Sequence, residues 1–164
     1  MIRLENFSIE DGLGRQLITD VNLFIPSGSI ILVQGKHSTG KTMLSRVIGL
    51  IDSPTKGNLY LLGKNVKKLN RTELSDIHSE IGIVFQENNF IKNFDLELNI
   101  IFPLILKSQN KNDIKLALKE LLPWLNLEKI IKKKIYQLSS AELKLAQFAR
   151  AIIGRPRVLL LDNF

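Results

Sequence analysis

The chain has 164 residues, of which 45% are hydrophobic and 24% are charged, so its length and composition fit one folded domain and argue against disorder. It has no cysteine and only two histidines, His37 and His78, which excludes a disulfide framework and a thiolate zinc site and argues against a histidine-based metal cluster. Its 23 basic and 16 acidic residues give a net charge of +7, which favours an anionic partner such as a nucleotide, a nucleic acid or lipid head groups.

The first half of the chain predicts short strands and two helices. Helices are expected over 41–51 and 71–79. Apolar runs bounded by turn residues predict strands over 2–9, 21–25, 29–34, 58–63 and 81–85. The strand over 29–34 leads directly into a loop that contains two glycines.

From residue 95 to 154 the pattern turns helical, with Pro103 and Pro123 as interruptions. The chain then closes on "VLLLD", residues 158–162, whose apolar residues predict a fully buried strand. A mainly helical insert is therefore expected between two pieces of an α/β core. The longest apolar run, 100–106, is far shorter than the roughly 20 residues of a membrane span, and no signal peptide opens the chain.

The loop between the strand at 29–34 and the next helix reads "GKHSTGKT" and has the spacing of a phosphate-binding P-loop. Gly35 and Gly40 allow a tight turn that directs backbone N–H groups at phosphate oxygens. Lys41 supplies a positive charge to the outer phosphates, and the Thr42 hydroxyl is placed to bind Mg²⁺. The predicted nucleotide-binding residues of this loop are Gly35, Lys36, His37, Ser38, Thr39, Gly40, Lys41 and Thr42.

Three further segments follow the P-loop in a recognisable order, namely "IGIVFQENN" with Gln86, "QLSSAELKLAQFARAI" (137–152) and "VLLLD". Together with the P-loop, these three segments make the chain resemble the ATP-binding domains of ABC transporters. The resemblance identifies the three segments, in chain order, as the Q-loop, the signature segment and the Walker B strand. The phrases "IGIVFQENNFI" and "NIIFPLIL" resemble the branch that contains the cell-division ATPase FtsE, with the lipoprotein-release ATPases next.

The resemblance implies an α/β fold: a P-loop NTPase core of the ABC type with an antiparallel β subdomain and a helical insert, and with the C-terminal part of the family's domain missing. It implies one domain over 1–164, with its core at 1–90 and 154–164 and a helical subdomain at about 91–153. The switch histidine of the family would lie in the missing part, and His78 precedes the Q-loop and cannot replace it.

The resemblance also assigns roles to single residues, with ATP and Mg²⁺ as cofactors. Lys41 and the loop amides would hold the β- and γ-phosphates, while Thr42, Gln86 and Asp162 would bind Mg²⁺. In this family two domains enclose two nucleotides, so Ser139 would contact the γ-phosphate held by a facing subunit. Gln86 and the residue at position 163 would form the catalytic pair.

A helix that begins at Ser139 suits that contact on physical grounds. Ser139 and Glu142 have the spacing of a capping box, in which each side chain accepts a hydrogen bond from the other residue's backbone. The helix would then present its positive dipole end and its free N–H groups outward. A plain helix cap without a ligand is the alternative interpretation.

Several positions depart from the family. Asn163 replaces the glutamate that would activate water, and because an amide cannot accept a proton, hydrolysis should fall by about 10² to 10⁴. Ser140 and Ala141 replace the signature glycines, and Ser38 replaces a loop glycine. Asp11 stands near the position where the family stacks an aromatic ring on adenine.

These observations favour an ATP-binding subunit of an FtsE-like ABC complex with impaired hydrolysis. Its expected partners are a permease-like or FtsX-like membrane subunit and a second copy of itself, at the cytoplasmic side of the inner membrane. One alternative is a non-enzymatic module that only docks a partner. Another is an ABC-like ATPase on nucleic acid, which we do not expect because aromatic residues are not interleaved with the basic ones.

Overall fold

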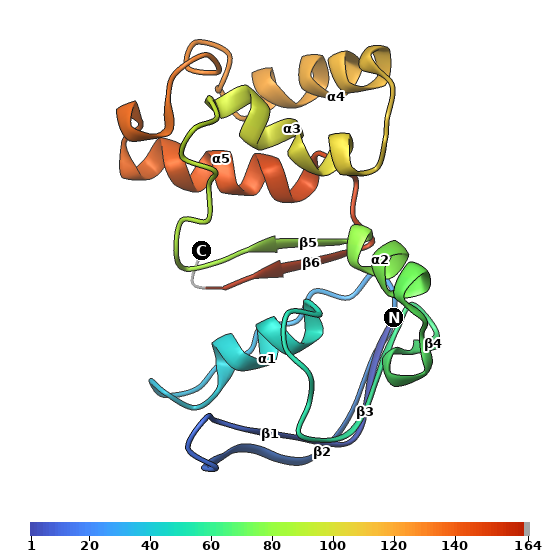
Figure 1. Ribbon diagram of the computed structural model, residues 1–164. Helices are drawn as coiled ribbons and strands as arrows, with labels where there is room; N and C mark the ends of the chain where they lie inside the picture. The colour runs from blue at the N-terminus through green and yellow to red at the C-terminus, as the bar shows by residue number, and fades with distance from the viewer. Residues whose placement is uncertain (163–164) are drawn as a thin grey trace. The chain divides into compact units, whose positions relative to one another are not determined.

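The computed structural model describes residues 1–162, and these residues form two compact units that divide between His78 and Ser79. Figure 1 shows their elements in order along the chain. The chain therefore combines an antiparallel part and a parallel part, as an α/β fold with an antiparallel β subdomain requires. The finer subdivision into a core at 1–90 and 154–164 and a helical subdomain at 91–153 stays a prediction.

The first unit is built on an antiparallel sheet with the strand order β2-β1-β3-β4. Its strands are β1 (Ile2–Glu10), β2 (Gln16–Ile25), β3 (Lys56–Leu61) and β4 (Lys64–Asn65). Its helices are α1 (Lys41–Ile48), the 3-10 turn η1 (Val66–Lys68) and α2 (Arg71–Ser79). Apolar side chains of β1, β3 and α1 form the buried core of this unit: Ile2, Leu4, Phe7, Ile9, Val47, Ile48, Leu59 and Leu61.

Asp11 stabilises the hairpin between β1 and β2. Its carboxylate accepts hydrogen bonds from the backbone N–H groups of Leu13 and Arg15, each at 2.9 Å, and from Arg15 Nε at 2.6 Å. The hydrogen bonds from Arg15, with the one from Leu13, lower the pKa of Asp11 from its ordinary value. The residue that stands near the adenine-stacking position of the family is therefore occupied with closing a turn.

The second unit pairs two parallel strands and covers them with helices. The strands are β5 (Ile81–Val84) and β6 (Val158–Leu161), and the helices are α3 (Leu96–Leu106), α4 (Lys111–Trp124), the 3-10 turn η2 (Ile135–Gln137) and α5 (Ser140–Ile152). The core of this unit joins α3 and α5 with the segment around Leu127 and Ile135. Pro103 and Pro123 lie inside α3 and α4 rather than between helices, so their expected role as interruptions was wrong.

The predicted strand over 29–34 is not a strand in the structure. Ile30 is 99% exposed and Leu32 is 78% exposed, whereas a buried strand would hide both side chains. A parallel strand also needs hydrogen-bonded neighbours, and the parallel sheet in residues 1–162 contains only β5 and β6. The apolar run therefore gave the wrong prediction, because hydrophobicity marks a segment suited to burial and does not supply the strands that bury it.

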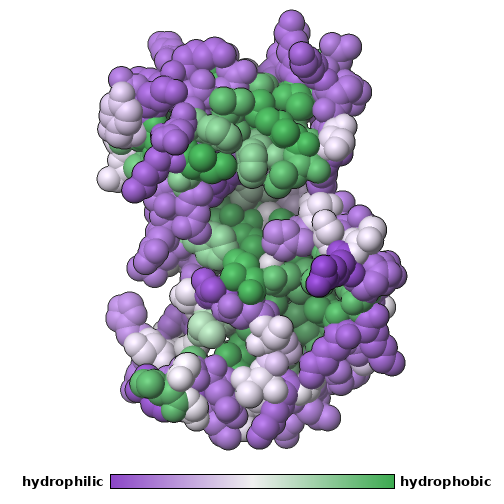
Figure 2. Space-filling view, viewed as in Figure 1, coloured by the Kyte–Doolittle hydropathy of each residue, from purple (hydrophilic) through white to green (hydrophobic). Residues whose placement is uncertain are grey.

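Exposed apolar side chains are also found on the helices of the second unit. Leu98, Ile105 and Leu106 of α3 and Leu116 of α4 are exposed. Figure 2 shows hydrophobic surface over these two helices. None of the helices in residues 1–162 is both long enough and apolar enough to cross a membrane.

Candidate functional site

The P-loop is an exposed turn that its own side chains close. The Lys41 ammonium donates hydrogen bonds to the carbonyl oxygens of Gly35 at 2.8 Å and Lys36 at 2.6 Å, and Thr39 Oγ1 donates to the same Lys36 oxygen at 2.9 Å. The positive charge of Lys41 is thus held against the first residues of the loop. The sequence pattern predicted a tight turn at Gly35 and Gly40, and the structure adds the hydrogen bonds by which Lys41 closes it.

Gly40 connects the loop to α1 in a way that only glycine allows. It is the N-cap of α1 and has a φ of 91°, in the left-handed region. A Cβ atom at this position would lie 3.0 Å from Leu17 Cβ on β2, so a side chain would be strained by the left-handed backbone and would require Leu17 to shift. The loop is therefore fixed at one end against β2, and Thr42 lies exposed in the first turn of α1.

The loop offers several donors to an anion. Among residues 1–162 the structure records no acceptor for the backbone N–H groups of 36–39. Lys36 and His37 are exposed beside them. Free amides at a helix N-terminus, together with nearby positive charge, form a site suited to phosphate. The predicted loop residues thus lie in one turn and the first turn of α1.

The second part of the predicted site lies at the carboxyl edge of β5 and β6. The two strands are in register, with Val84 opposite Leu161, and the Asp162 N–H donates to the Val84 oxygen at 2.9 Å. Gln86 follows β5 by two residues and is exposed, and Asp162 comes directly after β6. The structure therefore brings Gln86 and Asp162 to the same edge, as parallel strands require.

Asp162 has the features of a metal-binding acid. The residue is 8% exposed, and its Oδ2 atom is buried without a hydrogen-bond partner among the residues that the structure describes. A buried carboxylate oxygen without a partner is costly unless a cation or a bound water satisfies it. No group of three or more acidic, histidine or cysteine residues in 1–162 forms a metal cage. A single buried acid at the same strand edge as Gln86 fits Mg²⁺, which keeps several waters and takes few protein carboxylates.

The capping box at the start of α5 is confirmed. Glu142 N–H donates to Ser139 Oγ at 3.3 Å, and Ser139 N–H donates to Glu142 Oε2 at 2.7 Å. The hydrogen bond from the Ser139 backbone is the main reason that the pKa of Glu142 lies below its ordinary value. Ser139, Ser140 and Ala141 are all exposed, so the N-terminal end of α5 is accessible. Asn163 lies outside the described residues.

Sequence reasoning missed three polar residues that hold the segment after Gln86. Gln147 and Arg150 on α5 donate to main-chain oxygens of that segment, and the Asn99 side chain on α3 bonds both the N–H and the oxygen of Ile91. A signal existed, because Gln147 lies in the apolar run "AQFA" and Asn99 lies in "LNII", where a polar side chain needs a partner.

The basic run 129–134 is less available to an anionic partner than its sequence indicates. Lys132 pairs with Glu97 on α3, and Lys133 pairs with Glu142 at 3.5 Å. These ion pairs neutralise part of the run and connect it to the start of two helices. The interpretation of this stretch as a solvated face with structural contacts is thereby favoured over a nucleic-acid surface.

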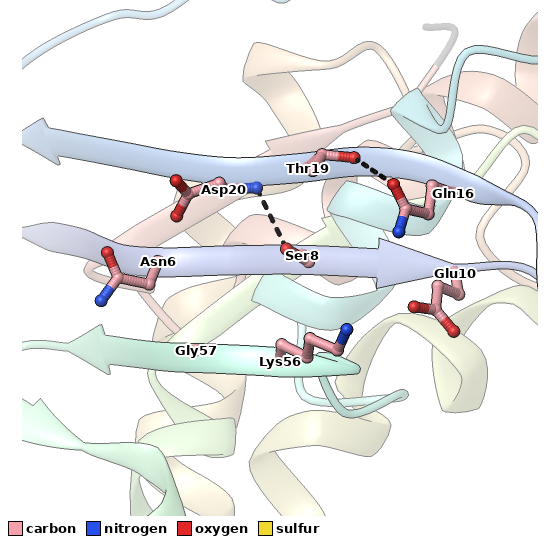
Figure 3. Close-up of a pocket in the computed structure, with 8 residues that line it drawn as sticks. All are labelled: Asn6, Ser8, Glu10, Gln16, Thr19, Asp20, Lys56 and Gly57. Atoms are coloured by element: carbon pink, nitrogen blue, oxygen red, sulfur yellow. Dashed lines mark hydrogen bonds between the residues drawn. The ribbon is translucent and has the colours of Figure 1, made fainter.

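A pocket of about 470 Å³ lies on the first unit and is lined by none of the P-loop residues. Its lining residues come from β1, β2 and β3: Asn6, Ser8, Glu10, Gln16, Thr19, Asp20, Lys56 and Gly57. Figure 3 shows Asp20 donating its backbone N–H to Ser8 Oγ, at 3.0 Å, so part of the polar lining serves the β1–β2 pairing. The pocket contains none of the predicted site residues, and the P-loop remains the better candidate.

Comparison with known proteins identifies close relatives of the chain. A family model described as "ABC transporter" matches residues 18–164. The methionine import ATP-binding protein MetN of Clostridium acetobutylicum is 33% identical over 99% of this chain and 51% of its own length. MetN of Desulfitobacterium hafniense is 34% identical over 99% of this chain and 49% of its own. The ABC transporter ATP-binding protein YxdL of Bacillus subtilis is 29% identical over 90% of this chain and 58% of its own.

The fold has a counterpart among solved structures. The ATP-binding cassette MJ0796, solved as a dimer in a post-hydrolysis state with ADP and Pi, matches with a TM-score of 0.89 and 29% identity, over 99% of this chain and 73% of that one. The chain spans about half the length of the MetN proteins that it matches. The motifs, the fold and the family match agree, and the chain belongs to the ABC transporter family of ATP-binding domains.

Proposed function

We propose that this chain is the nucleotide-binding part of an ABC-type transport complex and that it binds MgATP through its P-loop. The observation that carries the proposal is the loop itself, in which Lys41 and the N–H groups of 36–39 converge on one turn at the start of α1. The partnerless Oδ2 of Asp162 supports a metal at the β5–β6 edge. Bound Mg²⁺ would neutralise charge on the phosphates.

The residues have distinct parts in this proposal. Lys41 and the loop amides bind the outer phosphates, with Lys36 and His37 adding positive charge around them. Thr42, Gln86 and Asp162 hold Mg²⁺. Ser139 contacts the nucleotide of a second copy, in a homodimer that docks a membrane-embedded permease at the cytoplasmic face of the membrane. The absence of a carboxylate at position 163 supports weak hydrolysis, since a general base contributes about 10² to 10⁴ in rate.

The names of the relatives favour transport over cell division. The MetN proteins are named as methionine import ATP-binding proteins. We therefore propose an importer, with a small polar solute as the cargo class that these names indicate. The FtsE-type branch and an FtsX-like partner, which the sequence resemblance suggested, gain no support from the relatives reported above.

A degenerate partner-binding module is the second candidate. It is favoured by the side chains of Ser140 and Ala141 at the exposed start of α5 and by the engagement of Asp11 in a turn, because both weaken the expected contacts with ATP. In that case partner binding would depend on the helices of the second unit and would survive the loss of Lys41.

Equilibrium binding of a fluorescent ATP analogue with Mg²⁺ tests the proposal. Lys41→Ala should weaken binding about ten- to a hundredfold, because hydrogen bonds to charged groups are worth about 1.5–3 kcal/mol. Lys68→Ala is the matched control, since it removes the same charge from an exposed position of the first unit, and it should leave binding within about twofold.

In an assay of ATP hydrolysis, the unmodified protein should release phosphate more slowly than an Asn163→Glu variant does. Thermal unfolding without nucleotide checks that each variant is folded. If Lys41→Ala and Lys68→Ala bind the analogue equally well, the nucleotide-binding proposal fails and the partner-binding module takes its place.

A further inference from the structure

The pocket on the first unit lies where three neighbouring strands lose their regular pairing. The register of β1 shifts against both of its neighbours, β2 and β3, within residues 4–10. Three lining residues, one on each strand, have a left-handed backbone: φ is 46° at Asn6, 49° at Asp20 and 79° at Gly57. A Cβ atom at Gly57 would lie 2.2 Å from the Asn6 oxygen, so glycine is required there. Residues held in such conformations cluster at functional sites, and here they surround one cavity.

Three charged side chains line the pocket without an ion pair. Glu10 and Asp20 are negative and Lys56 is positive, and none of the three forms a salt bridge among residues 1–162. Elsewhere in the same unit such groups do pair, as Arg46 does with Asp52. The two carboxylates and the ammonium of the pocket are therefore available to a ligand.

Strand pairing arranges these charges around Ser8. Lys56 stands opposite Ser8 in the β1–β3 pair, and on the other side of β1 the Asp20 N–H donates to Ser8 Oγ at 3.0 Å. Glu10 is two residues further along β1, which is about 6.6–6.8 Å at the rise of a strand. Figure 3 shows Asp20 and Glu10 toward opposite ends of the pocket and Lys56 between them. Two separated negative groups thus lie around one positive group.

The size and polarity of the pocket indicate a small polar ligand. Its volume of about 470 Å³ lies within the range of about 300–1,000 Å³ that is usual for ligand pockets. Besides the charged groups it is lined by two amides and two hydroxyls, from Asn6, Gln16, Ser8 and Thr19. Such groups both donate and accept hydrogen bonds, so they can bind ammonium and carboxylate groups alike.

The charges also limit the kind of ligand. A metal ion is disfavoured, because no group of three or more acidic, histidine or cysteine residues in 1–162 could hold one and because Lys56 would repel it. A diamine would leave Lys56 without a partner, and a neutral amino acid would leave one carboxylate without a partner. A molecule with two positive groups and one negative group matches all three side chains.

We propose that this pocket is a second binding site of the chain and that it takes a basic α-amino acid. The two ammonium groups of the ligand pair with Glu10 and Asp20, and its carboxylate pairs with Lys56. The flexible four-carbon stem of a lysine separates its two ammonium groups, as the two separated carboxylates require. The inference goes beyond the proposed function, since the pocket and the P-loop share no residue.

Isothermal titration calorimetry with three matched probes tests the ligand class. L-lysine carries all three charges, cadaverine lacks the carboxylate, and norleucine lacks the side-chain ammonium. L-lysine should bind the unmodified protein about three- to tenfold more tightly than either analogue, because each analogue loses one charged contact that water partly screens.

Variants of the pocket test the site. Lys56→Met should abolish the preference for L-lysine over cadaverine, and it should not weaken cadaverine binding, because the charge that it removes repels a diamine. Glu10→Gln and Asp20→Asn should each weaken L-lysine about three- to tenfold. Glu128→Gln and Lys68→Met are the matched controls, since they remove the same charges from exposed positions outside the pocket, and they should leave the affinity within about twofold.

Thermal unfolding without ligand checks that each variant is folded, and if one pocket variant does not fold the other two decide. The proposal is overturned if L-lysine binds the unmodified protein no better than cadaverine or norleucine does. It is also overturned if the folded pocket variants bind L-lysine as tightly as the two controls do. These outcomes do not depend on nucleotide binding, so a failure of the proposed function would leave them unchanged.

Discussion

Ser38 stands in the phosphate loop with a backbone that favours glycine. Its φ is 61°, in the left-handed region, where an ordinary L-residue costs about 1–2 kcal/mol. The sequence showed that a serine replaces a glycine usual in the family, and the structure supplies the physical consequence. The loop can hold the curled form, but only against the preference of this residue.

Ser38→Gly should therefore tighten MgATP binding. Glycine would avoid the cost of the left-handed conformation, which favours binding by about 1–2 kcal/mol. The greater backbone freedom that glycine loses on binding offsets about 0.5–1 kcal/mol of this free energy. The net effect corresponds to an affinity about two- to fivefold higher, measured by titration with the fluorescent analogue. Ser38→Ala is the control, because it removes the hydroxyl and keeps the Cβ atom, and it should give no gain. An unchanged or weaker affinity of Ser38→Gly would show that the loop is not limited by its backbone.

The site residues fall into two groups, according to whether the residues that they contact are near or far in the sequence. Lys41 and the Ser139–Glu142 capping box act within six residues of their partners, so spacing alone pointed to them. Gln147 and Glu87 are 60 residues apart, and no local pattern contains that pairing. Contacts of this second kind need the three-dimensional fold, which is why the sequence predicted the phosphate loop and missed the supports of Gln86.

At the scale of elements, two apolar runs of similar composition reached different outcomes. "VLLL" forms the predicted strand β6 and pairs with β5 in register. Leu159 is 40% exposed and Leu161 is 47% exposed, so the prediction that this strand is fully buried was wrong. Residues 30–33 have as much apolar character, yet they form no strand and pair with neither sheet. A helix or a hairpin carries most of its hydrogen bonds within its own segment, so 71–79 and 2–9 were predicted well. A parallel strand depends on partners that the run itself does not specify.

The helix after the P-loop ends in an ion pair that depends on pH. Arg46 Nε and Nη2 donate to the two carboxylate oxygens of Asp52 at 2.6 and 3.2 Å. The hydrogen bond from Arg46 lowers the pKa of Asp52 from its ordinary value. A carboxylate with a lowered pKa in the folded state stabilises the fold above its unfolded pKa of about 3.9, and this stability is lost as the pH falls through the folded value.

Asp52→Asn should lower the free energy of unfolding at pH 7. Because the two side chains are 40% and 32% exposed, water screens the pair and the loss should be about 0.5–1 kcal/mol. Urea unfolding at pH 7 and at pH 3 measures it, and the difference from the unmodified protein should shrink at the lower pH, which lies below the unfolded pKa of about 3.9. Asp20→Asn, at an exposed carboxylate, should change little at either pH. A loss that is equally large at pH 3 would mean that charge is not its source.

At the scale of the whole molecule, the departures at Ser140 and Ala141 bear on one proposed step, the association of two copies around ATP. The cassette MJ0796, which this chain resembles, is solved as a dimer. Here Ser140 and Ala141 place side chains at the exposed start of α5, where a phosphate would approach the backbone. The N–H groups remain available, so the contact is weakened and not removed. Position 163 lacks a base, so bound ATP should persist long enough for an equilibrium measurement.

We expect the unmodified protein with MgATP to remain mainly monomeric at about 10 μM, because a weakened phosphate contact gives little free energy to offset the cost of association. Replacing both Ser140 and Ala141 by glycine opens the helix start and should strengthen the dimer about tenfold, or about 1.4 kcal/mol. Light scattering coupled to size-exclusion chromatography measures the dimer fraction. Adding Ser139→Ala to the glycine pair should reverse the gain, since it removes the hydroxyl that would contact the phosphate and also cap the helix. Equal dimer fractions in the unmodified protein and the glycine pair would show that the side chains at the start of α5 do not limit assembly. The exposed run at 30–33 would then be the next candidate for the surface that governs self-association.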